Sequence, residues 1–488
     1  MVLARKIAYN VVLNSFLKVF STVVLSLLSI RLMTGYLGQE GFGKYATILA
    51  FFAFFTAIAD LGLGSVTARE ISRESADEGK ILGNVVALRL TSSITLFLLS
   101  PAIIYFFGYS ADVKTGILIA ALAMVFSTLS SVLNGIFQKN LAMDRVAMVE
   151  FLGKLLQVGV ITIVVSRDFG FIAIVCTLII SLSFNAVTVL LLSRRYATFR
   201  LHFDFSFWKA FLKNSFPMGV TAIITFAYFK MDTILLSLLQ SNAHVGIYNV
   251  AYKIMENLIF FPAMLAGLIL PLLSRFIFTD RNRFEEIANK TFKVFCIIVV
   301  PIVVGTWFLA ADIIAIVSGT GFEESAGVLR ILIFALGWIF FGSYFNMLLV
   351  VGNAQKQLMQ TLIFVAVFNI GLNLFLIPHY SYIGAASTAL ATEALVALAT
   401  GYLTYRFVGY IPSFENIKRI LLSGGVMALF LFLLEPTSFV LSGTISMAVY
   451  IGMLWLTRAI SSAEIAGLFE KDRAPVLSPA ERVETLVP

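Results

Sequence analysis

Ionisable side chains lie inside long apolar stretches of this sequence, where they could bind an anion or carry a proton. Lys253 and Glu256 are three residues apart, so in a helix they share one face. Lys230 and Glu393 lie in two further apolar stretches. Because a charge at the centre of a membrane helix costs roughly 2.5–3.5 kcal/mol, each of these side chains is expected to face protein or water. There, an ammonium group can bind phosphate oxygens, and a carboxyl group can take up a proton.

These residues divide into two sets of candidates. The cationic set could line a cavity and bind an anionic ligand, and it comprises Lys18, Arg89, Lys154, Lys230, Lys253 and Arg330. The carboxyl set could couple transport to an ion, and it comprises Glu256, Glu393 and Asp60. Interhelical salt bridges, for example Lys230 with Glu256, are an alternative role for the same lysines. Charges near the ends of apolar stretches could instead reach the membrane surface, and these are Arg31, Asp60, Arg89, Glu150 and Arg330.

Four tyrosines in the same stretches, Tyr228, Tyr248, Tyr252 and Tyr344, could stack on sugars. The alternative is that they pack in the protein or belong to the aromatic belt at the membrane surface.

Other site chemistries have little support. The histidines, His202, His244 and His379, lie in separate loops, so they predict no metal centre. Cys176 and Cys296 lie within apolar stretches and imply no disulfide. The glycine-rich phosphate loop of ATP-binding proteins is absent, as are the Asp-x-Asp pair and the nucleophile motif expected of a glycosyltransferase or polymerase. We therefore expect no cofactor and no enzymatic activity.

The elements that carry these residues are expected to be transmembrane helices. Hydrophobic residues make up 59% of the chain and charged residues 13%. A membrane-spanning helix needs about 20 mostly apolar residues, and about fourteen such stretches occur, so we predict an all-α polytopic membrane protein. The stretches begin near Val11, Phe42, Asn84, Gly116, Ala147, Gly170, Phe216, Gly246, Phe292, Ala326, Leu358, Tyr382, Ile420 and Phe439. The first stretch is too long for a signal-peptide core, so we expect it to be retained.

The distribution of positive charge predicts the orientation of the chain. Most of the 35 Lys and Arg residues lie in loops on one side, whereas the opposite loops contain only Lys44, Lys114 and Arg167. The positive-inside rule places the Lys-rich and Arg-rich loops, and both termini, in the cytoplasm. The net charge of +8 is thereby explained without a nucleic-acid partner.

An internal repeat predicts two related lobes. Residues 43–46 and 246–249 begin the second and eighth stretches with similar sequences, and residues 135–140 and 352–357 end the fourth and tenth alike. A repeat of about six helices relates the halves by an axis along the membrane normal, with the substrate cavity between them. We predict lobes at residues 1–205 and 206–412, two extra helices at 413–460 and a polar cytoplasmic tail at 461–488. Near the boundary, Asp204 or Ser206 could cap a helix that lays aromatic residues into the membrane surface.

The stretch Tyr36 to Leu63, YLGQEGFGKYATILAFFAFFTAIADLGL, resembles the start of Wzx-type polysaccharide flippases. These belong to the multidrug/oligosaccharidyl-lipid/polysaccharide (MOP) exporter superfamily, with the multidrug extruders and the lipid II flippase. The resemblance continues through FLKNSFPMGV (Phe211 to Val220), VGIYNVAYKI (Val245 to Ile254) and IGAASTALATEALV (Ile383 to Val396). It implies a two-lobed bundle, alternating access and a polyprenyl-diphosphate-linked oligosaccharide as cargo, as in O-antigen and lipopolysaccharide synthesis.

We therefore expect a flippase of the cytoplasmic membrane that serves cell-surface polysaccharide biosynthesis. Its expected partners are the lipid-linked glycan, membrane lipids, a coupling proton or sodium ion, and polysaccharide polymerases. The main alternative is an ion-coupled multidrug or small-molecule exporter of the same superfamily, which should have an excess of acidic residues in its cavity. A membrane glycan polymerase or glycosyltransferase is a second alternative.

Overall fold

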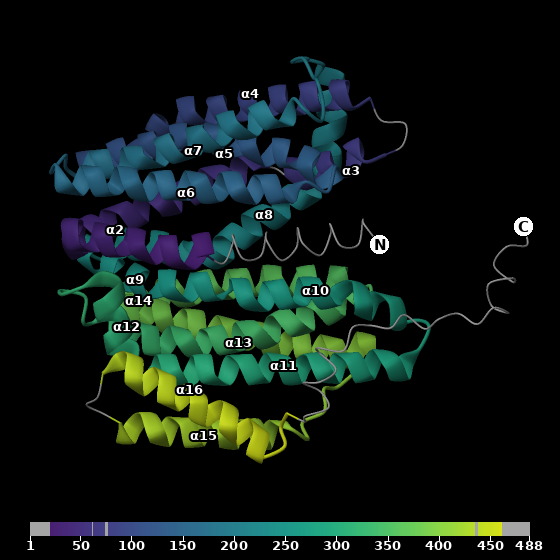
Figure 1. Cartoon of the computed structure of the whole chain (residues 1–488). Helices are drawn as coiled ribbons and strands as arrows, with labels where there is room; N and C mark the ends of the chain where they lie inside the picture. Colours follow the sequence, from purple (N-terminus) through teal and green to yellow (C-terminus); the bar gives the residue numbers. More distant parts are fainter. Residues whose placement is uncertain (1–19, 61, 74–76, 435–437, 461–488) are drawn as a thin grey trace, which may run out of the picture. The chain divides into compact units, whose positions relative to one another are not determined.

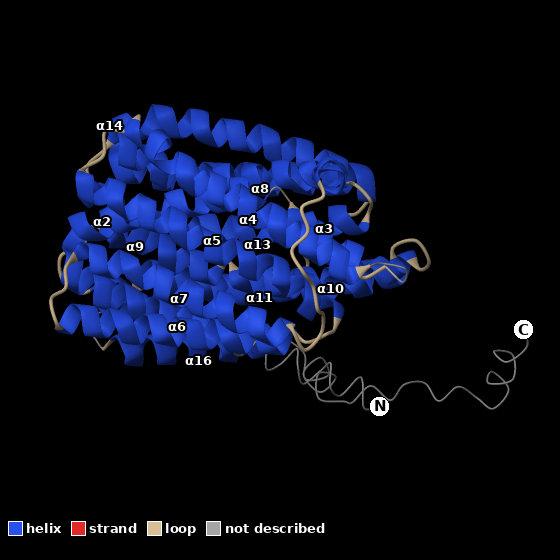
Figure 2. Ribbon diagram, turned by 90° about the horizontal axis from the view of Figure 1, so that it is seen from above, coloured by secondary structure: helices blue, strands red, loops and turns tan. Residues whose placement is uncertain are grey.

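The described residues of this computed structural model form helices, turns and loops, without a strand (Figure 2). They are residues 20–60, 62–73, 77–434 and 438–460. The first part of the chain contains η1 (Phe20–Leu25), α2 (Ser26–Asp60), α3 (Leu63–Ile71), α4 (Glu78–Tyr105), α5 (Ala111–Lys139), α6 (Met143–Ser166) and α7 (Phe171–Ser193). It is followed by α8 (Phe205–Leu239), α9 (Asn242–Leu258), α10 (Phe260–Phe276), α11 (Arg281–Phe308) and α12 (Ala310–Ser318). The chain continues through α13 (Ser325–Val351), α14 (Gln355–Leu403), η2 (Thr404–Val408), α15 (Ile417–Leu433) and α16 (Phe439–Leu456).

Eleven helical segments in the described residues are long and apolar enough to cross a membrane. The prediction of an all-helical, multi-span membrane protein is therefore confirmed. The number of segments is smaller than the predicted number of apolar stretches, and continuous helices explain part of the difference. Gly38, with φ of 63°, is a kink within α2, and Ser381, with φ of 50°, is a kink within α14. Helix α14 contains two of the predicted stretches, α2 contains the second and the end of the first, and α15, with 17 residues, is shorter than the segments counted.

The positive φ angle has a different energetic cost at each of the two kinks. Glycine adopts positive φ readily because it has no Cβ, so Gly38 bends α2 at little cost. Ser381 must hold the same sign of φ with a side chain, which is unfavourable for most residues. Its hydroxyl lies 2.9 Å from Nδ1 of His244 at the start of α9, and this contact connects the kink to the neighbouring helix.

The described helices fall into two compact units. The first comprises residues 1–287 and 309–411, and the second comprises residues 288–308 and 412–488, in so far as they are described. In the second unit, the Tyr450 hydroxyl donates a hydrogen bond of 2.9 Å to the Ile297 carbonyl, and Gly424 lies against Val300. The predicted lobe boundaries stay a prediction, and the predicted tail at 461–488 lies outside the described residues.

Within the first unit, α2 and α8 connect two groups of helices (Figure 1). One group contains α4, α5, α6 and α7, and the other contains α9, α13 and α14. Helix α2 packs on both α5 and α9, while α8 packs on α14, α2 and α3. The predicted cap of α8 is confirmed, because the Asp204 carboxylate accepts hydrogen bonds of 3.0 Å from the backbone N–H groups of Ser206 and Phe207.

Two glycines allow α2 and α9 to touch. A Cβ atom on Gly43 of α2 would lie 1.7 Å from the carbonyl oxygen of Asn242. A Cβ atom on Gly246 of α9 would lie 2.2 Å from the carbonyl oxygen of Gln39. Both distances are far below van der Waals contact, so only glycine permits this backbone approach.

Further contacts join α2 to the C-terminal helices at the same end of the bundle. The Thr34 hydroxyl donates a hydrogen bond of 2.9 Å to the Ser318 carbonyl, and the rings of Phe42 and Phe322 meet edge to face at 6.2 Å. We call the contacts at Gly43, Gly246, Thr34 and Phe42 the α2 seal. This end of the bundle also carries Lys44, which the charge distribution assigns to the outer side.

Candidate functional site

Two of the predicted lysines share one carboxylate within the first unit. Lys230 of α8 and Lys253 of α9 each place their Nζ atom 2.6 Å from a different oxygen of Glu256. Lys253 and Glu256 meet because residues three apart share a helix face, as the sequence predicted. The three side chains are 19%, 25% and 34% exposed, respectively, so they lie at an accessible surface of the bundle interior and not in a sealed core.

A third predicted lysine approaches this pair from the N-terminal helices. Lys154 of α6 donates a hydrogen bond of 3.0 Å to the side-chain carbonyl of Gln157 and lies within electrostatic reach of Lys253. No ion pair of Lys154 with a described residue occurs. We call Lys154, Lys230, Lys253 and Glu256 the lysine cluster. Lys230 and Lys253 share the Glu256 carboxylate and Lys154 adds a third ammonium group, so the cluster has an excess of positive charge suited to an anionic ligand.

A further carboxylate near the cluster is already engaged. Asp232 of α8 lies within electrostatic reach of Lys230, but its oxygens accept hydrogen bonds from the Tyr248 hydroxyl and from the backbone N–H of Thr233. Sequence reasoning did not select Asp232 as a site residue, although it is 6% exposed and charged. In the sequence, Asp232 was marked only as a carboxylate near the middle of a long apolar stretch.

Other cationic candidates are placed elsewhere. Arg89 of α4 is 1% exposed, donates a hydrogen bond of 2.6 Å to the Ala59 carbonyl and forms a salt bridge with Asp60. This salt bridge joins α4 to the end of α2, so each of the two side chains is the counterion of the other. Arg330 is exposed near the start of α13, and Lys18 lies outside the described residues.

The predicted tyrosines have different surroundings. Tyr248 and Tyr344 are fully buried, which fits the packing alternative. Tyr252 donates a hydrogen bond of 2.5 Å to the Phe229 carbonyl, and the Nζ atom of Lys230 lies 4.8 Å from the centre of its ring. Such a cation over an aromatic face is attractive. Tyr252 therefore belongs to the surroundings of the lysine cluster.

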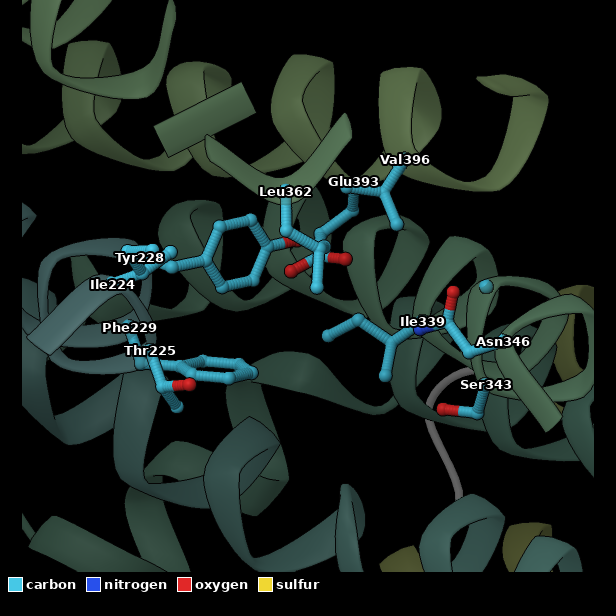
Figure 3. A pocket seen from close by; sticks show the side chains of 11 residues that line it. Ile224, Thr225, Tyr228, Phe229, Ile339, Ser343, Asn346, Leu362, Glu393 and Val396 are labelled. Carbon is cyan, nitrogen blue, oxygen red and sulfur yellow. The ribbon is translucent and has the colours of Figure 1, made fainter. Parts of the chain in front are cut away.

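Glu393 lines a cavity of about 150 Å³ between α8, α13 and α14 (Figure 3). We call this cavity the Glu393 pocket. Glu393 is 8% exposed, and it forms no salt bridge with a described residue. Tyr228 of α8 points toward it across the cavity, and Asn346 and Ser343 of α13 lie on the opposite wall.

One buried polar atom in this cavity, the Asn346 side-chain carbonyl oxygen, has no hydrogen-bond partner among the described residues. The Tyr228 hydroxyl instead interacts with the Glu393 carboxylate. Buried polar groups are normally hydrogen-bonded, so the Asn346 oxygen calls for a ligand or water. Sequence reasoning named Glu393 and Tyr228 but missed Asn346 and Ser343, because an uncharged polar residue in an apolar helix is a weak signal of function.

In the described part of the chain, no group of three or more His, Cys, Asp and Glu residues could hold a metal ion. His244 contacts Ser381 and the ring of Tyr382, and His379 contacts the Phe375 carbonyl of its own helix.

Comparison with known proteins identifies the family. The sequence profile described as "Polysaccharide biosynthesis protein" matches residues 32–327, which is more than half of the chain. The chain belongs to this family. The chain is also 24% identical over 416 residues to the "probable low-salt glycan biosynthesis flippase" of Haloferax volcanii, a match that covers 84% of this chain and 86% of that relative. The "probable flippase AglR" of the same organism is 28% identical over 211 residues, covering 42% of this chain and less than half, 44%, of that relative.

Solved structures show the fold of this chain. The lipid II flippase MurJ in an inward closed conformation superposes with a TM-score of 0.77 at 18% identity, covering 91% of this chain and 98% of MurJ. An inward-facing multidrug transporter of the MATE family and MOP superfamily gives a TM-score of 0.61 at 17% identity, covering 78% of this chain and 93% of the transporter. The chain therefore has the fold shared by MurJ and this MOP-superfamily transporter, and both curated relatives are named as probable flippases.

Proposed function

We propose that this protein is a flippase that moves a polyprenyl-diphosphate-linked oligosaccharide across the cytoplasmic membrane for cell-surface polysaccharide biosynthesis. The observation that carries the proposal is the lysine cluster, in which Lys230 and Lys253 share the Glu256 carboxylate and Lys154 of α6 lies within electrostatic reach of Lys253. A lipid diphosphate is negatively charged and needs cationic partners, whereas a purely lipophilic cargo needs none. The names of the two Haloferax relatives and the matching family profile support the same cargo class.

The transport cycle that we propose is alternating access. The α2 seal closes one end of the bundle with backbone contacts that no side chain could penetrate. In the proposed orientation that end faces away from the cytoplasm, so the cargo enters the lysine cluster from the cytoplasmic side. Opening of the seal then releases the sugars on the outer side while the polyprenyl chain stays in the lipid.

The topology that we propose has fourteen spans, with both termini in the cytoplasm. Counting α2 and α14 each as two spans, divided at Gly38 and Ser381, and counting α15 as a span supports this number. The distribution of Lys and Arg supports the orientation. The lobes at 1–205 and 206–412, with residues 413–460 outside the repeat, complete the proposed architecture.

The driving force that we propose is a proton or sodium gradient, with Glu256, Glu393 and Asp60 as the coupling candidates. Asp60 is paired with Arg89, and Glu256 is paired with two lysines, whereas Glu393 has no salt bridge among the described residues. No cofactor is needed, and polysaccharide polymerases are the proposed protein partners.

A multidrug or small-molecule exporter is the alternative function, because the fold is shared with the MATE transporter. Such an exporter of organic cations should present unpaired carboxylates to its cargo. The lysine cluster has the opposite charge balance, and this favours an anionic cargo.

The test is flipping of a lipid-linked oligosaccharide by the full chain reconstituted in liposomes. In Lys230→Gln and Lys253→Gln, one charge-assisted hydrogen bond to phosphate is lost, which corresponds to about 1.5–3 kcal/mol and a roughly ten- to hundredfold loss of cargo affinity. Either variant leaves Glu256 one lysine partner, so the fold is expected to persist. Lys230→Arg and Lys253→Arg should retain part of the activity.

Lys139→Gln is the matched control, because Lys139 pairs with Glu78 away from the lysine cluster. Flipping rates must be compared per folded protein, with melting temperature as the measure of folding. Wild-type flipping by both Gln variants at subsaturating cargo would contradict the cationic site. Transport of organic cations by the wild type, without transport of the lipid-linked glycan, would favour the exporter.

A further inference from the structure

We propose that the Glu393 pocket is a sugar subsite, which holds the monosaccharide bonded directly to the diphosphate of the cargo. This inference rests on the proposed function and deepens it by assigning the part of the cargo next to the phosphate. The pocket lies entirely in the first unit and is lined by α8, α13 and α14, with Glu393, Tyr228 and Asn346 as its principal polar residues (Figure 3).

The polar groups of the pocket match the hydrogen-bonding pattern of sugar hydroxyls. A hydroxyl group both donates and accepts, so one sugar can donate to the Glu393 carboxylate and to the unpaired Asn346 carbonyl oxygen. It can also contact the Tyr228 hydroxyl, which interacts with Glu393 in the same pocket. The Ser343 and Thr225 hydroxyls lie in the same lining and extend this pattern. A sugar would therefore satisfy the Asn346 oxygen, which the protein itself leaves unsatisfied.

The remaining walls and the volume also suit a sugar ring. The rings of Tyr228 and Phe229 lie on one side of the cavity, where the C–H face of a sugar can pack (Figure 3). Small-molecule sites are typically apolar and aromatic with a few polar groups that fix orientation. The volume of about 150 Å³ is roughly ten times what one water molecule requires, so the pocket can accept several ring atoms with their hydroxyls.

The position of the pocket relative to the lysine cluster fits a sugar bonded to a diphosphate. Phe229, in the pocket wall, directly precedes Lys230 in α8. Tyr252 connects the two places, because its hydroxyl donates to the Phe229 carbonyl while Lys230 lies over its ring. Tyr252 is also within electrostatic reach of Glu393. A diphosphate held by Lys230 would therefore have its first sugar beside this pocket.

A coupling ion is the competing occupant of the same cavity. A proton or a small cation would engage the Glu393 carboxylate, but it requires neither the aromatic wall nor a volume of this size. The two occupants predict different behaviour of variants toward cargo with and without a sugar, and this difference defines the experiment.

The experiment measures binding of two lipids to the full chain in nanodiscs: a polyprenyl diphosphate carrying one sugar, and the sugar-free polyprenyl diphosphate. Glu393→Gln is expected to bind the glycosylated lipid about tenfold more weakly, and Tyr228→Phe about two- to tenfold more weakly, because each loses a hydrogen bond to the sugar. Both variants should bind the sugar-free lipid like the wild type. Lys230→Gln should weaken binding of both lipids. Tyr109→Phe is the control, because its hydroxyl contacts Ser237 outside the pocket.

Three outcomes would overturn the sugar subsite. In the first, Glu393→Gln and Tyr228→Phe bind both lipids like the wild type. In the second, they weaken binding of both lipids equally. In the third, Glu393→Gln leaves binding unchanged but abolishes the dependence of flipping on a proton or sodium gradient, which assigns the pocket to the coupling ion. Failure of the proposed function is a separate result, since the wild type would then bind neither lipid.

Discussion

At the scale of single residues, the same charged side chains divide into those that bind one another and those available to a ligand. Buried Arg89 pairs with half-buried Asp60, whereas Glu256 is shared between two lysines and Lys154 has no ion pair among the described residues. The sequence named all of these residues and offered the Lys230–Glu256 salt bridge, which the structure contains, but it did not pair Arg89 with Asp60. Arg89 and Asp60 are 29 positions apart, and only the packing of α4 on α2 brings them together.

The Arg89 and Asp60 pair predicts a large stability effect without a specific effect on the cargo. Arg89→Met leaves the Asp60 carboxylate and the Ala59 carbonyl without their partner, and breaking a buried pair in this way typically costs about 3–5 kcal/mol. Because Asp60 is 30% exposed, water should reduce this cost, and we expect a value near or below the lower end. The measurement is the melting temperature of the purified protein in detergent.

The double variant Arg89→Met, Asp60→Leu removes both charges and should recover part of the lost stability. Cargo affinity per folded protein should stay at the wild-type level in both variants. A tenfold loss of cargo affinity in Arg89→Met with an unchanged melting temperature would instead indicate that Arg89 binds the cargo.

At the scale of elements, the sequence predicted the helices well and their continuity poorly. The apolar stretches, the cap at Asp204 and the contact of Lys253 with Glu256 all follow from local rules, and the structure confirms them. The helices α2 and α14 instead continue through Gly38 and Ser381, because one residue with positive φ redirects a helix without a loop. The Glu393 pocket could not be predicted, since its walls come from three helices distant in sequence.

The α2 seal predicts a conformational effect of adding one methyl group. In Gly43→Ala, the new Cβ atom would overlap the Asn242 carbonyl, so α2 and α9 must separate. We expect the outer end to open and to become accessible to solvent. The measurement is the rate at which a membrane-impermeant maleimide labels Ser318→Cys, in a background with Cys176 and Cys296 replaced by Ala.

Gly35→Ala is the matched control on the same helix, because a Cβ atom at Gly35 would meet no other atom within 4 Å. Labelling should rise several-fold in Gly43→Ala and remain at the background rate in Gly35→Ala. Equal labelling of the two variants would show that the glycine contact does not hold this end closed.

At the scale of the whole molecule, the charge asymmetry predicts which end of the bundle faces the cytoplasm. Ser110 lies exposed between α4 and α5 on the proposed outer side, and Arg195 lies exposed after α7 on the proposed cytoplasmic side. In intact cells, a membrane-impermeant maleimide should label Ser110→Cys but not Arg195→Cys. After permeabilisation it should label both. The reverse pattern would invert the proposed topology and the direction assigned to the α2 seal.

The sharing of Glu256 between Lys230 and Lys253 has a consequence for the lipids that the transporter must ignore. The bilayer surrounds the protein with phospholipids, each of which presents a single phosphate group. Such a headgroup must compete with a carboxylate that already lies 2.6 Å from both lysines. A diphosphate brings a second phosphoryl group to the same two ammonium groups, so it competes better with the carboxylate than a monophosphate does. If the lysine cluster binds the proposed cargo, the internal counterion would favour that cargo over the abundant membrane lipids.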